Sequence, residues 1–235
     1  MKIGFIVPAY KNPKQLEKCV KAIEAQKTKH EYELFVYDNN EHNVGFTKAV
    51  NVGLMKFVNY DYTVVLNQDC YIKPSFVNKL VNFMENHPKC FISGVKQISH
   101  EDEDFIVHGG CTEAFPQGKH IGGRKSQNAC NVSKKMAWVN GACMLVNMKL
   151  LPVVGTMDEN YFLLGSDSDW CYTANMKNTE VWYCADIEVV HEMGISASNE
   201  PSEMDTYKML DMVYFRDKWI NDGLFREISK EVHSS

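Results

Sequence analysis

The first part of the chain alternates apolar segments of strand length with amphipathic segments of helical period. The apolar runs cover residues 3–7, 33–37 and 62–66, and the helical segments cover residues 13–25, 46–57 and 74–84. Helices of this length between strands favour right-handed crossovers, which place neighbouring strands parallel to one another. The sequence therefore predicts an α/β fold with a Rossmann-like, mostly parallel central sheet flanked by helices.

After residue 90 the pattern changes to shorter strand-like segments between polar, glycine-rich stretches. These segments cover residues 90–95, 105–108, 137–146 and 181–190. Residues 111–135 lack any clear period and predict a long loop, which in a compact domain is usually functional or mobile. We expect a single domain over residues 1–235, made of a nucleotide-binding half (1–95), a small mixed half (96–200) and a C-terminal helical region (201–235).

The C-terminal region has apolar side chains between charges of both signs. Residues 203–219 have helical character and include Met209, Leu210 and Val213. A helix that lies on a membrane surface would have Lys and Arg dominating its polar face, which this segment does not show. We therefore expect packing or self-association, with a homodimer formed through the C-terminal helical region.

Composition limits the partners and the compartment. With 235 residues and a net charge of -5, the chain lacks the broad positive surface expected for nucleic acid or anionic lipid. Its eight cysteines include no CxxC pair, which favours free thiols in a reducing compartment. The first residues fit a strand better than a signal peptide, and no window reaches the ~20 apolar residues that cross a bilayer. These features predict a cytoplasmic protein without stable membrane insertion.

Polar side chains follow the predicted strands at the points where the strands end. The segments are Pro8-Ala9-Tyr10, Asp38-Asn39-Asn40 and Asn67-Gln68-Asp69. Open parallel sheets bind ligands outside the carboxyl ends of their strands. Asp38 can accept the imide hydrogen of a pyrimidine base on which Tyr10 stacks, and Asp69 can hold a divalent cation on a diphosphate. The pattern predicts a nucleotide site, although each segment is also typical of an ordinary strand-ending turn.

The order and spacing of these segments resemble the family 2 glycosyltransferases of the GT-A fold over about residues 2–194. The matching segments are residues 6–12, 36–39, 43–46 with 51–53, 67–69, 138–146, 157–162 and 166–171, together with His191. The pattern is most similar to rhamnosyltransferase-like and O-antigen members. The resemblance implies transfer of a sugar from a UDP- or dTDP-sugar to a hydroxyl acceptor, with inversion at the anomeric carbon.

The resemblance also implies roles for individual residues. Asp167 would be the general base, and Asp69 with His191 would hold Mn²⁺ or Mg²⁺ on the diphosphate. The residues implied to bind the nucleotide-sugar are Pro8, Ala9, Tyr10, Asp38, Asn40, Asn43, Gly45, Lys48, Asn67 and Gln68. Those implied on the acceptor side are Trp138, Gly141, Asp169 and Trp170.

Two positions depart from the family pattern. Asn67 replaces the first Asp of the DxD motif, which removes a negative charge and leaves Asp69 as the main ionic ligand. Ser166 replaces the first acid of the ED pair, so the base role falls to Asp167, with Asp169 as a structural residue or second candidate. Metal affinity is therefore expected to be lower than in the family at large.

Several of these residues have a second interpretation. Asp167 can cap a helix, and His191 can be an ordinary buried histidine. Trp138 and Trp170 can be core aromatics instead of platforms for a sugar. Lys48 can reach a phosphate or simply face solvent.

Two other functions are weighed against the same residues. A sugar-phosphate nucleotidyltransferase would carry a Gly-rich, Arg-bearing loop after the first strand, which residues 8–12 lack. Asn67 and Ser166 are the losses expected in a degenerate, non-catalytic sugar-nucleotide-binding protein, whereas the retained acids oppose that interpretation. The acceptor stays open among a saccharide, a lipid-linked saccharide, a protein and a modified nucleobase. The basic loop from Lys119 to Lys135 keeps the last class in consideration despite the acidic net charge.

Overall fold

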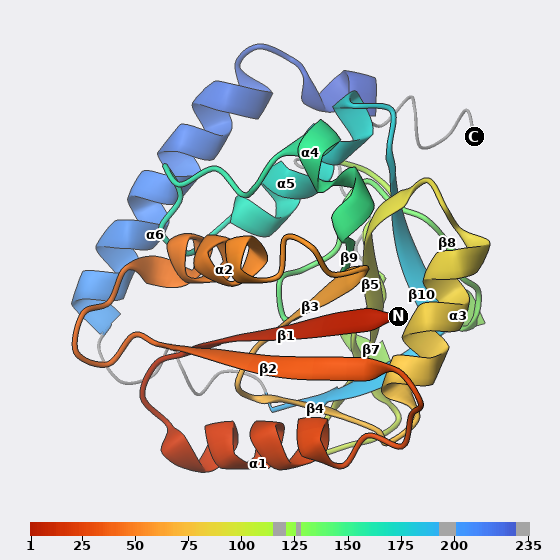
Figure 1. Cartoon of the computed structure of the whole chain (residues 1–235). Coiled ribbons are helices and arrows are strands. Elements are labelled where there is room, and N and C mark those ends of the chain that lie inside the picture. Colours follow the sequence, from red (N-terminus) through yellow and green to blue (C-terminus); the bar gives the residue numbers. More distant parts are fainter. Residues whose placement is uncertain (115–120, 126–127, 193–200, 229–235) are drawn as a thin grey trace.

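A single sheet forms the centre of the computed structural model, which describes residues 1–114, 121–125, 128–192 and 201–228 (Figure 1). Its strands are hydrogen-bonded in the order β2-β1-β3-β9-β5-β10-β4. They are β1 (Lys2–Ala9), β2 (Glu31–Asp38), β3 (Tyr62–Leu66), β4 (Cys70–Ile72), β5 (Cys90–Ser99), β9 (Cys143–Asn147) and β10 (Glu180–His191). Beside this path lie β6 (Phe105–His108), β7 (Arg124–Lys125) and β8 (Lys134–Lys135), of which β6 pairs with β5 and β7, and β8 with β10.

The strand directions divide the sheet. β1 is parallel to β2 and β3, and β5 is parallel to β10, whereas β9 is antiparallel to both of its neighbours and β4 is antiparallel to β10. The predicted parallel arrangement thus holds for the first three strands, but the sheet as a whole is mixed instead of mostly parallel. The crossover argument applies only to strands joined by helices, and β9 follows an irregular segment.

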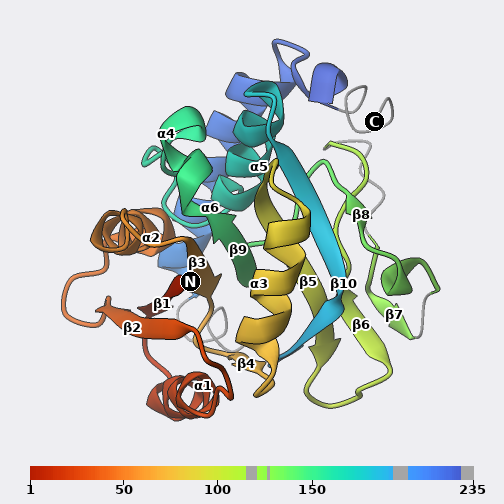
Figure 2. The ribbon, with the colours of Figure 1, turned by 45° about the vertical axis from the view of Figure 1, so that its right-hand side comes forward.

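Helices cover both faces of the sheet (Figures 1 and 2). They are α1 (Pro13–Glu24), α2 (Gly45–Lys56), α3 (Phe76–Asn86), α4 (Leu151–Val154), α5 (Ser166–Met176) and α6 (Pro201–Phe215), with a π-helical turn at Arg216–Ile220 and 3-10 turns at Asn128–Asn131 and Met148–Leu150. One buried apolar cluster joins the sheet to α1 and α3, and another joins it to α2, α4 and α5. The predicted α/β class, with helices flanking a central sheet, is therefore confirmed.

Burial on both faces explains the continuous apolar run of β1. Ile3, Phe5 and Val7 belong to the cluster with α1 and α3, while Ile6 belongs to the cluster with α2. A Cβ added at Gly53 of α2 would lie 2.6 Å from the Ile6 side chain. A larger residue at position 53 would therefore push α2 away from β1. This would disturb the edge of the sheet at which β1 ends and α2 begins.

Three segments differ from what the sequence predicts. In the predicted strand 137–146 only the part from Cys143 onward belongs to β9, because the backbone of Ala137 and Trp138 is hydrogen-bonded to Cys111. β4 was not predicted, since three residues are too few to show a period. Within the predicted loop 111–135 the described residues include β7, β8 and a 3-10 turn, whereas Lys119 lies outside the described residues.

α6 and the residues after it pack against α5 through a third apolar cluster. Its members are Ala114, Ala137, Tyr161, Tyr172, Phe215, Trp219, Phe225 and Ile228. On the other side of α6, Met209 and Leu210 are 62% and 57% exposed. The C-terminal helical region thus packs on its own domain, and the homodimer through its exposed side stays a prediction.

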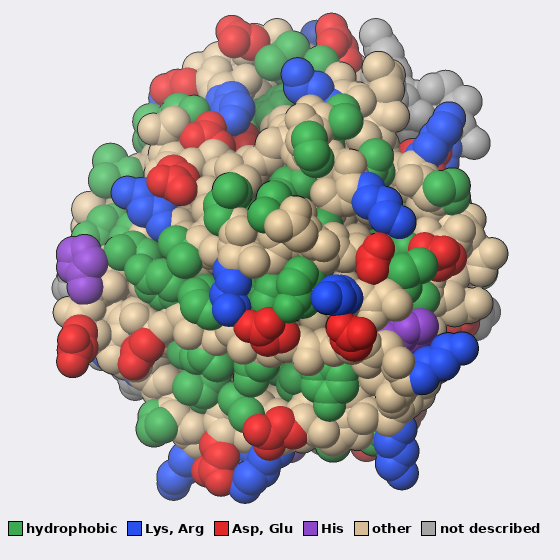
Figure 3. Space-filling view, in the orientation of Figure 1, with side chains coloured by type: hydrophobic (Ala, Val, Ile, Leu, Met, Phe, Trp, Pro, Cys, Tyr) green, Lys and Arg blue, Asp and Glu red, His purple; other side chains and the backbone are tan. Residues whose placement is uncertain are grey.

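The surface charges and the state of the cysteines agree with what the composition predicts. Lysine, arginine and acidic side chains are interspersed on the face drawn in Figure 3, without a large area of one sign. All eight cysteines are free, as predicted, and all of them are buried. Among the helices that the structure describes, none has the length and apolarity to span a bilayer.

Candidate functional site

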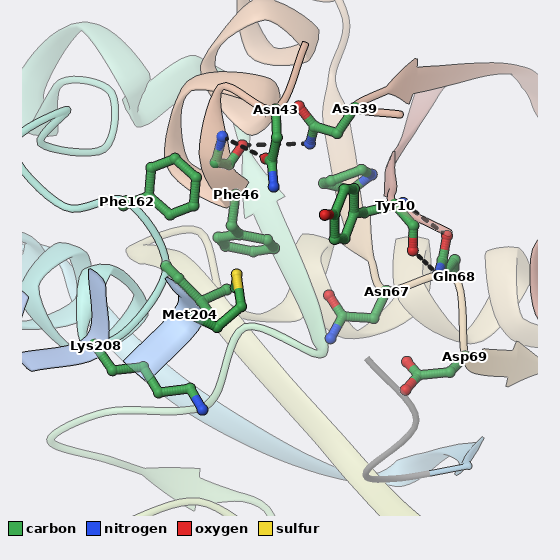
Figure 4. Close-up of a pocket in the computed structure, with 13 residues that line it drawn as sticks. Tyr10, Asn39, Asn43, Phe46, Asn67, Gln68, Asp69, Phe162, Met204 and Lys208 are labelled. Atoms are coloured by element: carbon green, nitrogen blue, oxygen red, sulfur yellow. Dashed lines mark hydrogen bonds between the residues drawn. The ribbon is translucent and has the colours of Figure 1, made fainter. Parts of the chain in front are cut away.

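A pocket opens where β1, β2 and β3 end (Figure 4). We call it the first pocket, and the residues that line it are Pro8, Tyr10, Asn39, Asn43, Gly45, Phe46, Asn67, Gln68, Asp69, Phe162, Leu163, Met204 and Lys208. A second pocket is lined by Phe46, Asn67, Asn140, Gly141, Ala142, Leu163, Asp167 and His191. The two pockets share Phe46, Asn67 and Leu163, so they are adjacent, and we call the two together the cleft.

Gln68 joins the loop after β1 to the loop after β3. Its side chain accepts a hydrogen bond from the Tyr10 backbone N–H at 3.0 Å, and its amide donates to the Tyr10 carbonyl at 2.8 Å. Gln68 is only 4% exposed, so this pair of bonds is shielded from water. The contact fixes the backbone from which the Tyr10 ring reaches the first pocket.

The loop after β2 is held at the surface by its own side chains. Asp38 is exposed and accepts hydrogen bonds from the backbone and side-chain nitrogens of Asn40, and Asn40 in turn accepts one from the Lys11 N–H at 2.7 Å. Neither Asp38 nor Asn40 lines the first pocket. Ala9 is 1% exposed within β1, so its side chain is also outside the pocket lining.

Asn39, which was not assigned a role from the sequence, organises the start of α2. It is 3% exposed, accepts a hydrogen bond from the Val44 N–H at 3.1 Å and donates to the Gly45 carbonyl at 3.4 Å. Asn43 accepts a bond from the Gly45 N–H at 2.9 Å. Only the position of Asn39 directly after the strand was visible in the sequence, and such asparagines usually form turns.

Gly45 is required by both its backbone and its surroundings. Its φ is +86°, and an added Cβ would lie 2.5 Å from the Phe162 carbonyl oxygen. The same carbonyl accepts a hydrogen bond from the Phe46 N–H at 2.8 Å. This contact brings the segment before α5 against the start of α2 and closes one wall of the pocket. Lys48, in contrast, is exposed and outside the lining.

Asp69 and His191 face each other across the junction of β4 and β10. The His191 Nε2 lies 3.7 Å from the Asp69 Oδ1, and both side chains are about nine-tenths buried. Burial raises the pKa of Asp69 to about 6 and lowers the pKa of His191 to about 4. Near pH 7 the aspartate is mostly charged and the histidine is neutral, so the pair is a carboxylate beside a free imidazole nitrogen and not an ion pair.

Gln97 of β5 orients His191. The His191 Nδ1 lies 3.1 Å from the Gln97 Oε1, which can only accept a hydrogen bond, so the ring proton belongs on Nδ1. Gln97 is 0% exposed and is also bonded to Asn140. This arrangement leaves the Nε2 lone pair directed toward Asp69, as in imidazoles that coordinate a metal.

The donor set around Asp69 suits a hard divalent cation. One ligand atom from each of Asp69, Cys70 and His191 lies within 4.8 Å of the others. Cys70 is completely buried, and burial raises its pKa well above the usual value. Carboxylate oxygens fit Mn²⁺ or Mg²⁺ better than a thiol does, so Asp69 is the fitting ligand, with the His191 imidazole beside it as a borderline donor.

Asp167 lies in the first turn of α5 and lines the second pocket. Its Oδ2 accepts a hydrogen bond from the Gly141 N–H at 2.7 Å, and its Oδ1 accepts one from the Ser168 N–H at 2.7 Å. Burial raises its pKa above the usual range, although these two bonds oppose that shift. A carboxylate fixed by backbone donors at the wall of a cleft can accept a proton from a bound hydroxyl group.

Three of the four expected acceptor-side residues lie outside both pockets. Asp169 is 2% exposed and accepts hydrogen bonds from Trp219 at 2.6 Å and Lys218 at 2.8 Å, so it anchors the C-terminal region. Trp170 is 1% exposed, donates to the Gly155 carbonyl and packs in the core, which excludes stacking on a sugar. Trp138 is half-buried, packs against the core and does not line either pocket.

Asp211 of α6 holds the segment that forms the far wall of the cleft. Its carboxylate accepts hydrogen bonds from the backbone N–H groups of Phe162, Leu163 and Leu164, each at 2.8 Å. It is 3% exposed, and the neighbouring Tyr207 ring stacks on Phe162 with centroids 4.0 Å apart. Nothing in the sequence pattern indicates this contact, because an acid in an amphipathic helix usually faces water.

Replacing Asp211 by Asn should lower the free energy of unfolding by about 2–4 kcal/mol. The change removes the charge and turns one acceptor into a donor that faces buried N–H groups. Urea denaturation measures the effect. Asp205→Asn, on the same helix but exposed, is the control and should change stability by less than about 0.5 kcal/mol. Equal midpoints for the two variants would contradict the anchoring role.

Sequence comparisons with known proteins find a matching family model and a distant relative. A family model described as "Glycosyltransferase like family 2" matches residues 39–208. Among curated proteins, the low-salt glycan biosynthesis hexosyltransferase Agl10 of Haloferax volcanii is 20% identical over 198 residues. That match covers 78% of this chain and 59% of the relative, so the chain spans little more than half of the relative's length.

Solved structures share the architecture at low sequence identity. A structure of GalNAc-T7 with UDP, GalNAc and Mn²⁺ superposes with a TM-score of 0.72 at 11% identity, covering 94% of this chain and 49% of that one. A structure of S. aureus TarS in complex with UDP-GlcNAc superposes with a TM-score of 0.59 at 13% identity, covering 89% of this chain and 64% of that one. These superpositions confirm the expected GT-A fold.

Proposed function

The chain belongs to the glycosyltransferase-like family 2, and from this premise we propose that it moves a sugar from a nucleotide diphosphate-sugar to a hydroxyl acceptor, with inversion. The observation that carries the proposal is the pair of adjacent pockets, whose walls contain the Asp69–His191 pair and Asp167. A leaving diphosphate and an attacking hydroxyl need such groups on opposite sides of one sugar ring.

The donor is proposed to lie in the first pocket with its base toward the ends of β1 and β2. Tyr10 offers an aromatic face for a pyrimidine, and Asp38, the neighbour of the lining residue Asn39, offers a carboxylate for the base imide once its bonds to Asn40 rearrange. UDP is favoured as the nucleotide because the GalNAc-T7 and TarS structures contain UDP or UDP-GlcNAc. A dTDP-sugar presents the same imide and remains part of the proposal.

The diphosphate is proposed to lie beside Asp69 and His191, which would hold Mn²⁺ or Mg²⁺. Such a cation, when bound, supplies Lewis-acid stabilisation of the charge on the leaving oxygens. Asn67, in the shared wall of the two pockets, offers a neutral amide where the family motif has a second acid. The protein therefore supplies one carboxylate and one imidazole, and Gln97 keeps the imidazole in the required tautomer.

Substitution of Gln97 by Leu is expected to weaken Mn²⁺ binding by about 10–100-fold, the usual cost of removing a group that orients a metal ligand. Without Gln97 the His191 ring loses the acceptor for its Nδ1 proton. Electron paramagnetic resonance of free Mn²⁺ measures the affinity. Gln97→Glu keeps an acceptor for Nδ1 and should bind Mn²⁺ more tightly than Gln97→Leu; the reverse order would contradict the orienting role.

Asp167 is proposed to act as the general base. The acceptor hydroxyl oxygen forms a bond to the anomeric carbon while the bond from that carbon to the diphosphate oxygen breaks, and its electron pair stays on the nucleoside diphosphate. The hydroxyl proton passes to the Asp167 carboxylate. Gly141 and Ser168 each occupy one site on that carboxylate, which leaves further lone pairs for the proton. Attack opposite the leaving group inverts the anomeric configuration.

The test is an assay of nucleoside diphosphate release. UDP-, dTDP- and GDP-sugars are incubated with the protein and Mn²⁺, alone and with a saccharide, a lipid-linked saccharide, a peptide or an oligonucleotide that contains hydroxymethyl-pyrimidine. Acceptor-dependent release supports the proposal and identifies the acceptor class. Donor binding without any turnover would indicate the non-catalytic alternative. Pyrophosphate release from a nucleoside triphosphate and a sugar phosphate would indicate the nucleotidyltransferase.

A further inference from the structure

The first pocket contains a positively charged side chain that belongs to the C-terminal helix α6. Among the described residues that line it, the charged side chains are Asp69 and Lys208. Lys208 follows Met204 by four residues on α6, so both lie on the same helix face, and both line the pocket. Figure 4 shows the Lys208 side chain extending from α6 toward the side of the pocket that carries Asn67 and Asp69.

The backbone of Lys208 is held firmly in place. Tyr207 stacks on Phe162, and Asp211, one turn further along α6, accepts hydrogen bonds from the segment that includes Phe162 and Leu163. These contacts tie α6 to the pocket wall on both sides of Lys208. The position of the Lys208 backbone therefore depends on buried contacts and not on a loose helix end.

The Lys208 ammonium is available for exchange to another anion. Its partner is Asp205, at 3.2 Å within the same helix, and the two side chains are 33% and 64% exposed. Exposed ion pairs of this kind contribute little, typically less than about 1 kcal/mol. A phosphate oxygen in a partly enclosed pocket is a stronger partner for the same ammonium.

The charge balance of the pocket indicates what that partner is. A diphosphate that leaves a sugar gains negative charge as the bond breaks, and it does so beside the carboxylate of Asp69. Asn67 adds no charge, and with one carboxylate in place of two the pocket holds a divalent cation less firmly. An ammonium that extends into the same pocket from α6 would neutralise part of the diphosphate charge whether or not a metal is bound.

We propose that Lys208 binds the diphosphate of the donor and of the leaving nucleotide, so that α6 forms part of the donor site. The proposal rests on the proposed function and extends it by one residue. In a pocket where Asn67 stands in place of an acid of the metal motif, Lys208 would supply part of the charge stabilisation directly.

The experiment compares UDP with uridine, which lacks the diphosphate. Isothermal titration calorimetry measures the affinity for UDP, and a displacement titration against UDP measures the affinity for uridine. The proteins compared are the wild type, Lys208→Met, Lys208→Arg and Asp205→Asn, each in Mn²⁺ and in EDTA. We expect Lys208→Met to weaken UDP binding by about tenfold, in the range of a lost charge-assisted hydrogen bond, with uridine unchanged. Lys208→Arg should retain most of the affinity, and the loss in Lys208→Met should be larger in EDTA.

The Asp205→Asn variant separates phosphate binding from a structural role. It breaks the same ion pair as Lys208→Met but keeps the ammonium, so its affinity for UDP should equal or exceed that of the wild type. Equal losses for UDP and uridine, or a loss in Asp205→Asn that matches Lys208→Met, would overturn the proposal. So would unchanged UDP binding in Lys208→Met while the wild type binds UDP well. A wild type that binds none of UDP, dTDP and GDP would instead overturn the proposed function together with this inference.

Discussion

Replacing Asp167 by Asn is expected to lower the rate of sugar transfer by about 10²–10⁴-fold, the usual contribution of a general base. The amide keeps the size of the carboxylate and can still accept a bond from Gly141 or Ser168, but it cannot take the acceptor proton. Donor binding should stay close to that of the wild type, because Asp167 lines the second pocket and not the first. Single-turnover rates and the Kd for UDP separate the two effects.

The pH profile gives the same prediction a second readout. Burial raises the pKa of Asp167, so a larger fraction of it is protonated at a given acidic pH than for an ordinary aspartate. The base is present above the raised pKa and is lost as the pH falls through it, so the transfer rate should begin to fall at a higher pH than about 4. Asp186→Asn, an exposed acid outside the cleft, is the control. A full rate in Asp167→Asn would refute the assignment.

Replacing Asp69 by Ala should remove most of the metal-stimulated rate, a loss on the order of 10²–10³-fold. The expected loss is large because Asn67 has no charge to take over, and His191 alone offers a single neutral ligand. Initial rates over a range of Mn²⁺ concentrations measure the effect, and Mn²⁺ binding is followed in parallel.

Asn67→Asp tests the same site in the opposite direction. A second carboxylate beside Asp69 should tighten Mn²⁺ binding, because more ligand charge raises the affinity of oxygen-rich sites. If Asp69→Ala keeps a wild-type response to Mn²⁺, the cation does not bind where we propose. If Asn67→Asp leaves Mn²⁺ affinity unchanged, then the missing acid is not what limits it.

The sequence predicts those parts of the fold that local patterns determine. β1 and β3 are buried on both faces, so their apolar runs are continuous, and the helices between them have a clear period. Parallel strands joined by helices end at one edge, which is why Tyr10, Asn67 and Asp69 were expected together and line one pocket. In this part of the chain, neighbours in sequence determine neighbours in space.

The remaining part of the site depends on contacts between distant segments. Asp211 is bonded to backbone groups some fifty positions earlier, and Gln97 of β5 is bonded to His191 of the neighbouring strand β10. Neither residue type marks such a contact in a single sequence. Trp170 shows the converse, because the motif around Asp167 suggested a binding role, whereas its indole is enclosed in the core. Local patterns carry no information about which side of a distant element a residue will meet.

The antiparallel insertion of β9 has a consequence for chimeric proteins. Because β9 runs opposite to β3, its beginning lies beside the end of β3, and the Asn67 N–H is bonded to the Ala142 carbonyl at 2.9 Å. Gly141, which holds the Asp167 carboxylate, is thus next to a residue that is hydrogen-bonded to the loop carrying Asp69. A fragment exchange between relatives at residue 95 would cut through β5 and separate β9 from its two neighbours. Parts of such proteins can be exchanged only if the strand pairs on either side of the cleft come from the same parent.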